Sequence, residues 1–350
     1  MNQVDLLAEE IGGNWPSIRQ ARSNSLETIG KLTESLEAFT APDTSVVISG
    51  SLARFEMTPG SDIDWSLLLD GPSDPNHLKI SQEIGAAVNQ VARKGVGKEG
   101  TFGTMVSSHN LINYIGGEVD TNSNTTQRSL LLLESRCIGN AEAYNRVKRN
   151  LLKRYLSEDS GLWRASVENK LPHFLMNDLA RYWRTMTVDY AYKQRTRGGV
   201  GIPLRNIKLR MSRKLIYVAG LLACYDCHLA FDDEARVEFY KDRNVPGLVA
   251  RLHETLEQTP LEITANLLRR FPEHNDATKK LFDAYDQFLR LLLNDDSRNH
   301  LEQLHADATE NDAIYLKAKE AAHQFRDALE EIFLDGRSIL KKFTIKYGVF

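Results

Sequence analysis

The sequence predicts an α+β fold, in which a small mixed β-sheet with flanking helices is followed by an all-helical bundle. Two observations support this prediction. Short apolar and β-branched runs at Thr44–Ile48 and Trp65–Leu69 are separated by a loop that contains glycine and proline, as two strands would be. From Thr121 onward, nearly every segment instead has apolar residues at helical spacing. The chain is therefore expected to change from a sheet to helices along its length.

Helices and short strands are expected to alternate in the first third of the chain. The N-terminal 39 residues read as helical, and the proline-containing stretch 40–43 separates them from the first strand. His77–Arg93 has the apolar spacing of a helix. Thr101–Ser108 and Leu111–Ile115 fit either two strands or a strand followed by a helix.

The remaining elements are predicted to be helices joined by short connections, one of which is the glycine-rich run 198–203. The predicted helices cover Thr125–Arg136, Ala141–Tyr155, Pro172–Lys193, Arg205–Tyr225 and Glu310–Leu334. We expect three parts: an N-terminal helical segment (1–40), a domain built on the sheet (41–156) and a helical domain (157–350).

Composition excludes some classes of protein. The 350 residues have 42% hydrophobic and 26% charged side chains and a formal net charge of −3, which argues against a nucleic-acid coat protein but permits a local basic groove. The longest apolar run, Leu215–Tyr225, is about half a membrane span. No secretory pattern is seen, and the three cysteines cannot all pair. We expect a cytoplasmic protein without a membrane partner, and buried free thiols at Cys224 and Cys227.

Two aspartates at the start of the second strand are the strongest candidate site. Because side chains alternate along a strand, Asp62 and Asp64 share one face while Ile63 and Trp65 point the other way. Two ionised carboxylates side by side favour a divalent cation between them. The alternative is that the Ser-Asp-x-Asp sequence only forms a turn before the strand.

A Gly-Ser pair precedes the aspartates. Gly50 permits close approach of the backbone to a phosphate, and Ser51 can donate a hydrogen bond to a phosphate oxygen. Arg54 follows on the same loop and either contacts phosphate or pairs with Glu56. Metal and phosphate together predict phosphoryl or nucleotidyl transfer.

The pattern Gly50-Ser51, ten residues, Asp62-Ile-Asp64 resembles the signature of the DNA-polymerase-β-like nucleotidyltransferase superfamily. Within that superfamily the chain is similar to the PII uridylyltransferases, the glutamine synthetase adenylyltransferases and uncharacterised nucleotidyltransferases related to them. The features that match this group are Arg54, Glu56, Ser61 and a segment, Leu131–Asn140, similar to a leucine-rich helix of the uridylyltransferases.

The resemblance implies that residues 41–156 form the catalytic domain. It implies that Asp62 and Asp64 are catalytic and bind Mg²⁺, with Mn²⁺ as a possible substitute, and that an NTP such as ATP is the substrate. The residues that it implies for nucleotide or phosphate binding are Gly50, Ser51, Arg54 and Ser61.

The superfamily usually has a third catalytic and metal-binding carboxylate on a later strand. Asp120 is the first choice here, because an apolar run leads into it and a polar loop follows. Glu118 and Glu99 are alternatives. Asp120 can equally be the N-cap of the helix that follows.

A basic cluster without acidic residues lies between positions 193 and 214. It consists of Lys193, Arg195, Arg197, Arg205, Lys208, Arg210, Arg213 and Lys214. These charges form either a clamp for triphosphate or nucleic acid, with Arg205, Lys208 and Arg213 on phosphate, or a solvated helix face paired with acidic stretches. We favour the clamp because the cluster includes a glycine-rich loop.

Three functions remain open at this point. The first is a Mg²⁺-dependent nucleotidyltransferase that moves an NMP from an NTP to a hydroxyl of a protein side chain or an RNA 3′ end and releases pyrophosphate. A role as a toxin or in phage defence belongs to this hypothesis. The second is a regulatory module that binds nucleotide with little or no turnover. The third is a scaffold whose basic face, 193–214, binds nucleic acid.

Overall fold

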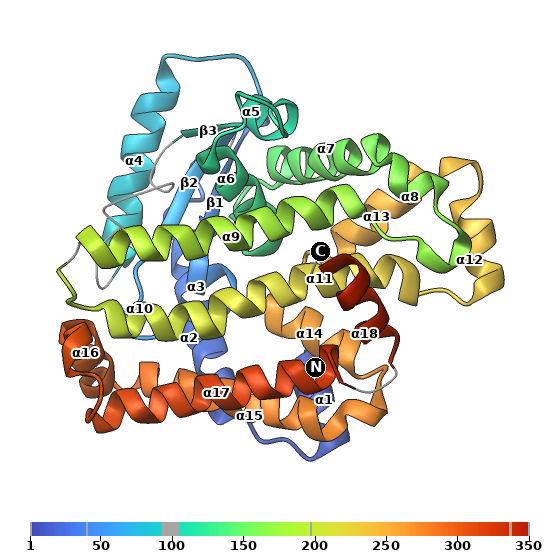
Figure 1. Ribbon diagram of the computed structural model, residues 1–350. Coiled ribbons are helices and arrows are strands. Elements are labelled where there is room, and N and C mark those ends of the chain that lie inside the picture. Colours follow the sequence, from blue (N-terminus) through green and yellow to red (C-terminus); the bar gives the residue numbers. More distant parts are fainter. Residues whose placement is uncertain (1, 40, 93–104, 197, 336–337, 349–350) are drawn as a thin grey trace.

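The structure, a computed structural model, describes residues 2–39, 41–92, 105–196, 198–335 and 338–348. One mixed sheet lies at one side of the molecule, and long helices fill the rest (Figure 1). This confirms the coarse α+β class, a small mixed sheet together with many helices. The strands are β1 (Thr44–Ser49), β2 (Asp64–Leu69), β3 (Met105–Ser107) and β4 (Ser135–Ile138).

The sheet has the order β3-β2-β1-β4. β1 pairs antiparallel with both β2 and β4, and β2 pairs parallel with β3. Every residue of β1 is buried, because this central strand is covered on both faces. Val46 and Ile48 pack in a small core cluster with Trp65, whereas Val47 faces the other way into the main core. β1 is thus the strand that holds both layers together.

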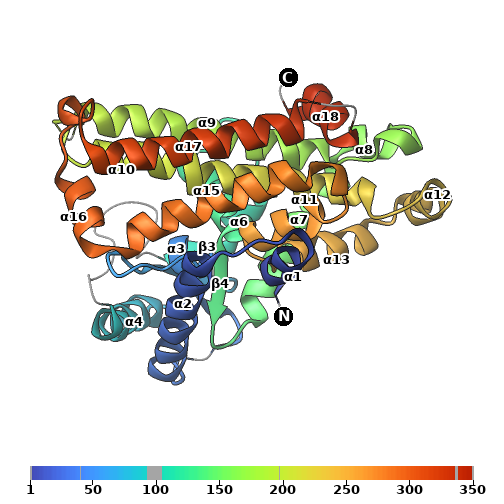
Figure 2. The same cartoon turned by 90° about the horizontal axis from the view of Figure 1, so that it is seen from below.

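Helices from the N-terminal half cover the sheet. α2 (Pro16–Ser35) and α4 (Asn76–Val91) lie side by side over one face (Figure 2). The other face is covered by α5 (Ser108–Asn113), α6 (Asn122–Leu133) and α7 (Glu142–Glu158). The four-residue helix α3 (Gly50–Ala53) follows β1 directly.

The C-terminal half is helical throughout its described residues. Its longer helices are α9 (His173–Thr196), α11 (Lys214–Leu229), α13 (Val245–Thr255), α15 (Asn275–Leu293) and α17 (Ala313–Phe333). The shorter ones are α8 (Ser160–Arg164), α10 (Ile202–Lys208), α12 (Asp233–Tyr240), α14 (Pro260–Leu268), α16 (Asp295–Gln303) and α18 (Ile339–Phe343). A π-helical turn, Leu209–Arg213, joins α10 to α11.

The N-terminal helices contact the far end of the chain. α1 (Gln3–Ile11) packs on α14, and α2 packs on α15 as well as on α4. The buried Trp15 before α2 stacks on Phe282 of α15, with ring centroids 4.7 Å apart. Residues 2–39 therefore join the sheet to the helical body, and the division at residues 40 and 156 stays a prediction.

The structure corrects one predicted helix and resolves one ambiguity. The segment Leu131–Asn140, expected to be a helix, is helical only to Leu133; residues 135–138 form strand β4 beside β1. Hydrogen bonds to β1 stabilise this strand, and a short polar sequence does not predict such pairing. The ambiguous stretch before residue 115 is a strand, β3, followed by the helix α5.

The two thiols of α11 are buried, as expected. Cys224 and Cys227 are buried in α11 and are free, and burial raises the pKa of both thiols. Within the described residues, none of the helices alone is long and apolar enough to cross a membrane. The bent pair Ile202–Leu229 and Asp233–Arg243 meets the length and composition requirement only when its two parts are taken together.

A buried ion network fastens α6 to α9. The Arg128 side chain is fully buried, and its two terminal nitrogens donate hydrogen bonds of 2.7 Å to the two carboxylate oxygens of Asp120. It also donates to Asp178 at 2.7 and 3.0 Å and to the Tyr155 hydroxyl at 2.9 Å. Arg181 of α9 contacts the same Asp120 carboxylate at 2.5 Å. A buried guanidinium requires such complete pairing.

We expect Arg128→Met to lower the free energy of unfolding by about 3–5 kcal/mol, because two buried carboxylates lose their shared counter-charge. Urea denaturation measures this loss. The control is Arg326→Met on α17, where the half-exposed guanidinium pairs with the exposed Asp327; its effect should stay within about 0.5 kcal/mol. Equal effects of the two substitutions would contradict the assignment of Arg128 to a structural network.

Candidate functional site

The two candidate aspartates lie at the start of β2, on the face predicted for them. Ile63 and Trp65 are buried in the small core cluster, whereas Asp62 is exposed and Asp64 is half-buried. Within the described part of the chain, neither carboxylate has a hydrogen-bond or ion-pair partner. The binding of a metal by Asp62 and Asp64 stays a prediction.

Gly50 explains why a glycine stands just after β1. Its φ of +69° lies in the left-handed region, which side chains disfavour. A Cβ atom at this position would also lie 2.7 Å from the Oδ2 atom of Asp64. Ser49 is the register partner of Asp64, so the strand pairing brings the carboxylate directly over Gly50. The Gly-Ser turn and the aspartates consequently form one local unit.

Glu134 is a third carboxylate at the same end of the sheet. Ser49 pairs with Asp64 on one side and with Ser135 on the other, so Gly50 lies between the start of β2 and Glu134. Since neighbouring strands are about 4.8 Å apart, the two outer backbones are about 10 Å apart, within reach of carboxylate side chains over a glycine. The negative charge of Glu134 contributes to the electrostatic environment of Asp64.

Arg54 is paired and buried. Its guanidinium donates to Glu56 at 2.9 Å and also contacts Glu134. The side chain of Arg54 is only 11% exposed, and Tyr182 of α9 donates a 3.3 Å hydrogen bond to Glu134. Of the two roles expected for Arg54, pairing with Glu56 is the one observed, and its contact with phosphate stays a prediction. Arg54 balances part of the acidic charge beneath the site.

Asp120 does not lie with the other carboxylates. It precedes α6, whereas Glu134 follows α6, and a 12-residue helix is about 18 Å long. Burial alone would raise the pKa of Asp120, but hydrogen bonds from Arg128, Gly116 and Arg181 outweigh it and lower the pKa to about 2. The structure therefore does not place Asp120 beside Asp62 and Asp64, as its predicted role as the third carboxylate requires; Glu134 is the further carboxylate whose charge acts on Asp64. Glu118 is exposed in the same turn as Asp120, and Glu99 lies outside the described residues.

Ser61 also has a structural role. It is buried, and its Oγ atom accepts a 3.1 Å hydrogen bond from the Thr58 amide and lies 3.1 Å from the Thr58 hydroxyl. The predicted contact of Ser61 with phosphate is corrected accordingly, because its hydroxyl closes the turn before Asp62. Ser51 is half-buried in the first turn of α3, and its binding of phosphate stays a prediction.

Two cations of the basic cluster lie near the carboxylates. Lys208 is half-buried at the end of α10, and its environment includes the charges of Asp62 and Arg213. Lys208 and Arg213 are five residues apart, which in an α-helix places them about 140° apart around the axis. The π-helical turn between them closes i→i+5 hydrogen bonds and brings them toward one face. Arg205 lies one turn before Lys208 and is half-buried.

The rest of the basic cluster is dispersed. Lys193 pairs with Asp189 at 2.7 Å, and the guanidinium of Arg195 lies over the Tyr192 ring. Lys214 lies in the field of Arg210 on its own helix and of Arg326 and Glu330 on α17. Arg197 lies outside the described residues. Only part of the predicted clamp therefore faces the aspartates.

Burial and neighbouring charges of the same sign shift the pKa values of Asp64 and Lys208. Burial and the negative charges of Asp62 and Glu134 raise the pKa of Asp64 to about 7. Burial, together with the positive charges of Arg298 and Arg213, lowers the pKa of Lys208 to about 7. In this environment the charged forms of both Asp64 and Lys208 are disfavoured. Such a pair of shifted pKa values indicates a site arranged for a charged ligand.

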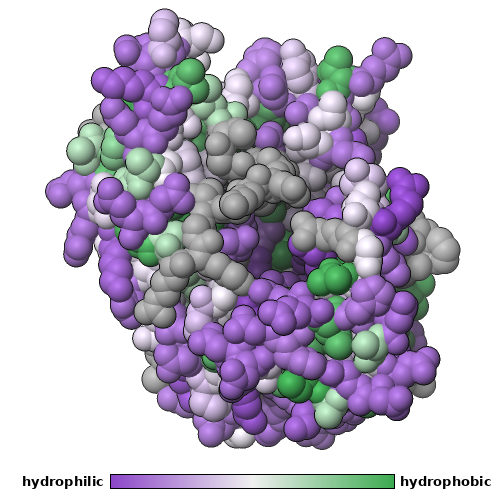
Figure 3. Space-filling view, turned by 90° about the vertical axis from the view of Figure 1, so that its left-hand side faces the viewer, coloured by the Kyte–Doolittle hydropathy of each residue, from purple (hydrophilic) through white to green (hydrophobic). Residues whose placement is uncertain are grey.

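The molecule is hollowed on the face where α4, α10 and α16 lie. Figure 3 shows the hollow near the centre of this face, with hydrophilic residues around much of it. The charge of Asp62, at the start of β2, acts on Lys208, at the end of α10. One group therefore comes from the sheet and the other from the helices. The site thus lies between the two parts of the fold.

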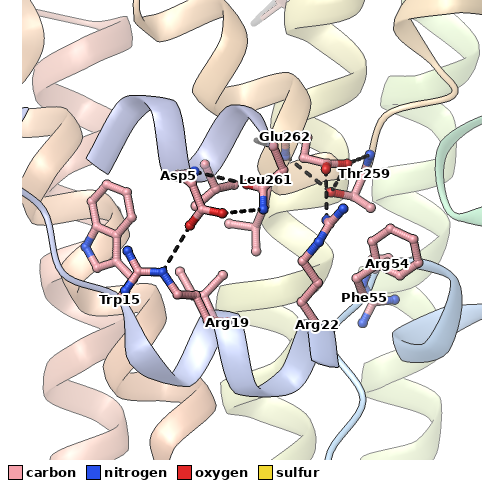
Figure 4. A pocket seen from close by; sticks show the side chains of 12 residues that line it. Asp5, Trp15, Arg19, Arg22, Arg54, Phe55, Thr259, Leu261 and Glu262 are labelled. Carbon is pink, nitrogen blue, oxygen red and sulfur yellow. Dashed lines mark hydrogen bonds and ion pairs between the residues drawn. The ribbon is translucent and has the colours of Figure 1, made fainter. Parts of the chain in front are cut away.

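A separate pocket lies behind Arg54. Figure 4 shows that α1, α2 and the start of α14 line it, with Arg54 and Phe55 at one end. Its polar groups are paired with one another: Arg22 contacts Glu262 at 2.8 Å, and Arg19 contacts Asp5 at 3.0 Å. This pocket therefore supports the loop after β1 and offers no unpaired charge to a ligand.

Phe55 occupies a strained position next to this pocket. Its φ is +60°, which is unfavourable for an aromatic side chain. The guanidinium groups of Arg22 and Arg136 lie 4.6 and 4.1 Å from its ring centroid and hold it in place. Backbone strain of this kind is often found in functional loops. Phe55 lies in the loop that leads from β1 to the aspartates.

Sequence reasoning missed two residues of this site. Glu134 meets the criterion that selected Asp120, an apolar run leading into a carboxylate, because Leu130–Leu133 precede it and are all buried. Arg298 of α16 shows no signal in the sequence, since its partners near Asp62 are about 240 residues away.

We expect Gly50→Ala to destabilise the protein more than Gly12→Ala. Both glycines have positive φ, +69° and +65°, so both substitutions incur about 1–2 kcal/mol of backbone strain. Only at Gly50 does the new Cβ meet a side chain, that of Asp64; nothing lies within 4 Å at Gly12. Thermal and urea unfolding compare the two variants. Equal losses would show that Asp64 does not lie against Gly50 in solution.

We expect Asp64→Asn to gain stability over the wild type as the pH rises from about 4 to 8. Between the unfolded pKa near 3.8 and the folded pKa of about 7, Asp64 retains its proton in the folded wild type but has lost it in the unfolded chain. Wild-type stability therefore falls with rising pH, and asparagine cannot ionise. The relative gain should be on the order of 2 kcal/mol by urea denaturation. Asp70→Asn, at the other end of β2, is the control, and a gain as large there would contradict this account.

Comparison with known proteins does not place the chain in a family. No protein-family model matches it, and no curated protein matches it.

Proposed function

We propose that this protein is a Mg²⁺-dependent nucleotidyltransferase, which transfers an NMP from an NTP to an acceptor hydroxyl and releases pyrophosphate. The observation that supports this most directly is the arrangement at one end of the sheet. Asp62 and Asp64 lie there with Glu134 on the other side of Gly50, and Lys208 and Arg213 approach from the helices. Acidic and basic groups on opposite sides suit a metal and a triphosphate.

The donor set fits Mg²⁺. This ion is usually bound by one or two carboxylates together with waters and substrate phosphates, and it needs no cage made only of protein. Asp62 and Asp64 would hold it, since neither has a partner among the described residues. Burial and the negative charges of Asp62 and Glu134 raise the pKa of Asp64, and a cation beside the carboxylates would offset both effects. When bound, Mg²⁺ neutralises charge on the phosphates of the nucleotide.

The remaining groups would bind and orient the substrate. Lys208 and Arg213 would bind phosphate oxygens by charge-assisted hydrogen bonds, and Ser51 would donate to another. The reaction joins the acceptor oxygen to the α-phosphorus, breaks the bond from that phosphorus to pyrophosphate, and passes the hydroxyl proton to a carboxylate at this end of the sheet. Arg54, fixed by Glu56 and Glu134, keeps those carboxylates in place.

For the acceptor we propose only a chemical class. A protein side chain or an RNA 3′ end is proposed, because the net charge of −3 does not suit a processive nucleic-acid polymerase. The proposal includes a cytoplasmic location and leaves open a role as a toxin or in phage defence.

A module that binds NTP without turnover is the second candidate. The observation that favours it is that the described residues contain no group of three or more His, Cys, Asp or Glu side chains that could hold a metal. A nucleic-acid scaffold is less well supported, because Lys193 and Arg195 have local partners and Lys208 and Arg213 turn toward the carboxylates instead of forming one basic surface.

The test is incubation with each α-labelled NTP, Mg²⁺ and cell extract as a source of acceptors. We expect the wild type to release pyrophosphate and to label an acceptor. Asp62→Asn with Asp64→Asn should reduce both at least 100-fold while the fold is kept, and Lys208→Met should raise the KM for NTP about tenfold, since one phosphate contact is worth roughly 1.4 kcal/mol.

Asp70→Asn is the matched control for this experiment. It changes a carboxylate at the opposite end of β2, where it pairs with Arg146 at 2.5 Å, and it should retain wild-type transfer. Label transfer that survives loss of both Asp62 and Asp64 would refute the metal assignment. NTP binding by the wild type without release of pyrophosphate, for every base and extract, would favour the second candidate.

A further inference from the structure

Arg298 joins the helical body to the loop that carries Asp62. It lies on α16 and is 4% exposed, although its side chain is long and charged. One terminal nitrogen donates to the Thr58 hydroxyl at 2.6 Å, the other donates to the carbonyl of Gly60, and Nε donates to Glu302 at 3.1 Å. A planar guanidinium can make all of these contacts at once, which an ammonium cannot.

The contact with Thr58 leads directly to the candidate site. The Thr58 hydroxyl lies 3.1 Å from the Ser61 hydroxyl, and the Ser61 amide donates to the Thr58 carbonyl at 2.9 Å. Asp62 is the next residue. The backbone that sets the position of the Asp62 carboxylate is therefore hydrogen-bonded, through Ser61 and Thr58, to Arg298.

Gly60 is adapted to this contact. A Cβ atom at position 60 would overlap the Nε, Cδ and Cζ atoms of Arg298. Because the guanidinium is buried and has partners on several sides, it cannot move aside without losing hydrogen bonds. A glycine here is consequently explained by packing against the arginine.

The turn after α16 holds the opposite side of the site. The backbone of Gly199–Gly201, which leads into α10, is hydrogen-bonded to residues 304–306: Gly201 donates to Leu304 at 3.1 Å, and Ala306 donates to Gly199 at 3.0 Å. Val200 forms a β-bridge with His305. The glycine-rich connection is thus held by backbone hydrogen bonds, and α10 carries Lys208 from this fixed point.

We infer that Arg298 is a positioning residue of the proposed nucleotidyltransferase site, and that α16 with the turn 304–306 sets the spacing between Asp62 and Lys208. This inference rests on the proposed function for the identity of the substrate. α16 contacts the loop before Asp62 through the Arg298 side chain. The turn 304–306, which follows α16, holds the segment before Lys208 by backbone hydrogen bonds, so α16 and this turn together fix both sides of the site. Release of either contact widens or misaligns the space between the carboxylates and the amine.

The first measurement is hydrogen exchange, which needs no substrate. Arg298→Met and Gly60→Ala should each make the amides of residues 58–64 exchange at least tenfold faster, and Arg298→Lys should have a smaller effect. The control for the arginine is Arg236→Met, a buried arginine of α12 that likewise donates to backbone carbonyls, those of His228 and Phe231. Gly30→Ala, where nothing lies within 4 Å, is the control for the glycine. Both controls should leave exchange in 58–64 unchanged.

The second measurement is the rate of pyrophosphate release as a function of Mg²⁺ and of ATP, UTP, CTP and GTP. We expect Arg298→Met and Gly60→Ala to raise the KM for Mg²⁺ and for the preferred NTP about tenfold. Arg298→Lys should recover part of this loss, and Arg236→Met should retain the wild-type KM even if its Tm falls. A role of Arg298 in overall stability alone would lower the Tm without moving either KM.

The outcomes separate this inference from the proposed function. Unchanged exchange at 58–64 in Arg298→Met, or faster exchange with both KM values unchanged, overturns the positioning role. A wild type that neither binds nor turns over any NTP overturns the proposed function, and the exchange comparison then decides alone whether Arg298 holds the loop. Exchange and KM that change together in Arg298→Met and Gly60→Ala, but in neither control, support the inference.

Discussion

The contact of the Asp64 carboxylate with Gly50 is the constraint on which the rest of the site depends. The register of two antiparallel strands places them together, and no side chain can be added at position 50 without displacing the carboxylate. The same pairing leaves Asp62 exposed at the strand's beginning, while the neighbouring strand β4 brings Glu134 to the other side of the glycine. Three carboxylates thereby collect at one end of a sheet whose central strand is fully buried.

Such a concentration of negative charge needs compensation, and the protein supplies it from two directions. Beneath the site, the buried Arg54 neutralises Glu56 and Glu134. Facing it, Lys208 and Arg213 approach on either side of a π-helical turn. Burial, together with the positive charges of Arg298 and Arg213, lowers the pKa of Lys208. Neither group of charges is fully balanced, which is the physical reason for expecting a charged ligand between them.

The helical body also determines the geometry of the site. Tyr182 of α9 donates to Glu134, α10 carries Lys208, and α16 holds the loop before Asp62 through Arg298. These helices come from sequence positions more than 100 residues beyond the aspartates. The sheet alone would present the carboxylates without the groups that hold and oppose them.

The local part of this arrangement could be predicted from the amino-acid sequence alone. Alternation along β2 predicted which aspartates share a face, the run of apolar and polar residues predicted both strands of the central pair, and helical periodicity predicted α4, α9 and α17 with small errors at their ends. These features depend on neighbours within a few residues, so their signal is contained in a short stretch of sequence.

The contacts between residues far apart in the sequence could not be predicted in this way and are known from the fold. Asp120 and Glu134 have similar sequence surroundings, but Asp120 is taken by Arg128 and Arg181, whereas Glu134 reaches the aspartates because residues 135–138 form a strand beside β1. Arg298 could not be foreseen, since the pattern around it is that of an ordinary helix. Long-range ion pairs and strand pairing depend on how elements pack together, and no local periodicity records that packing.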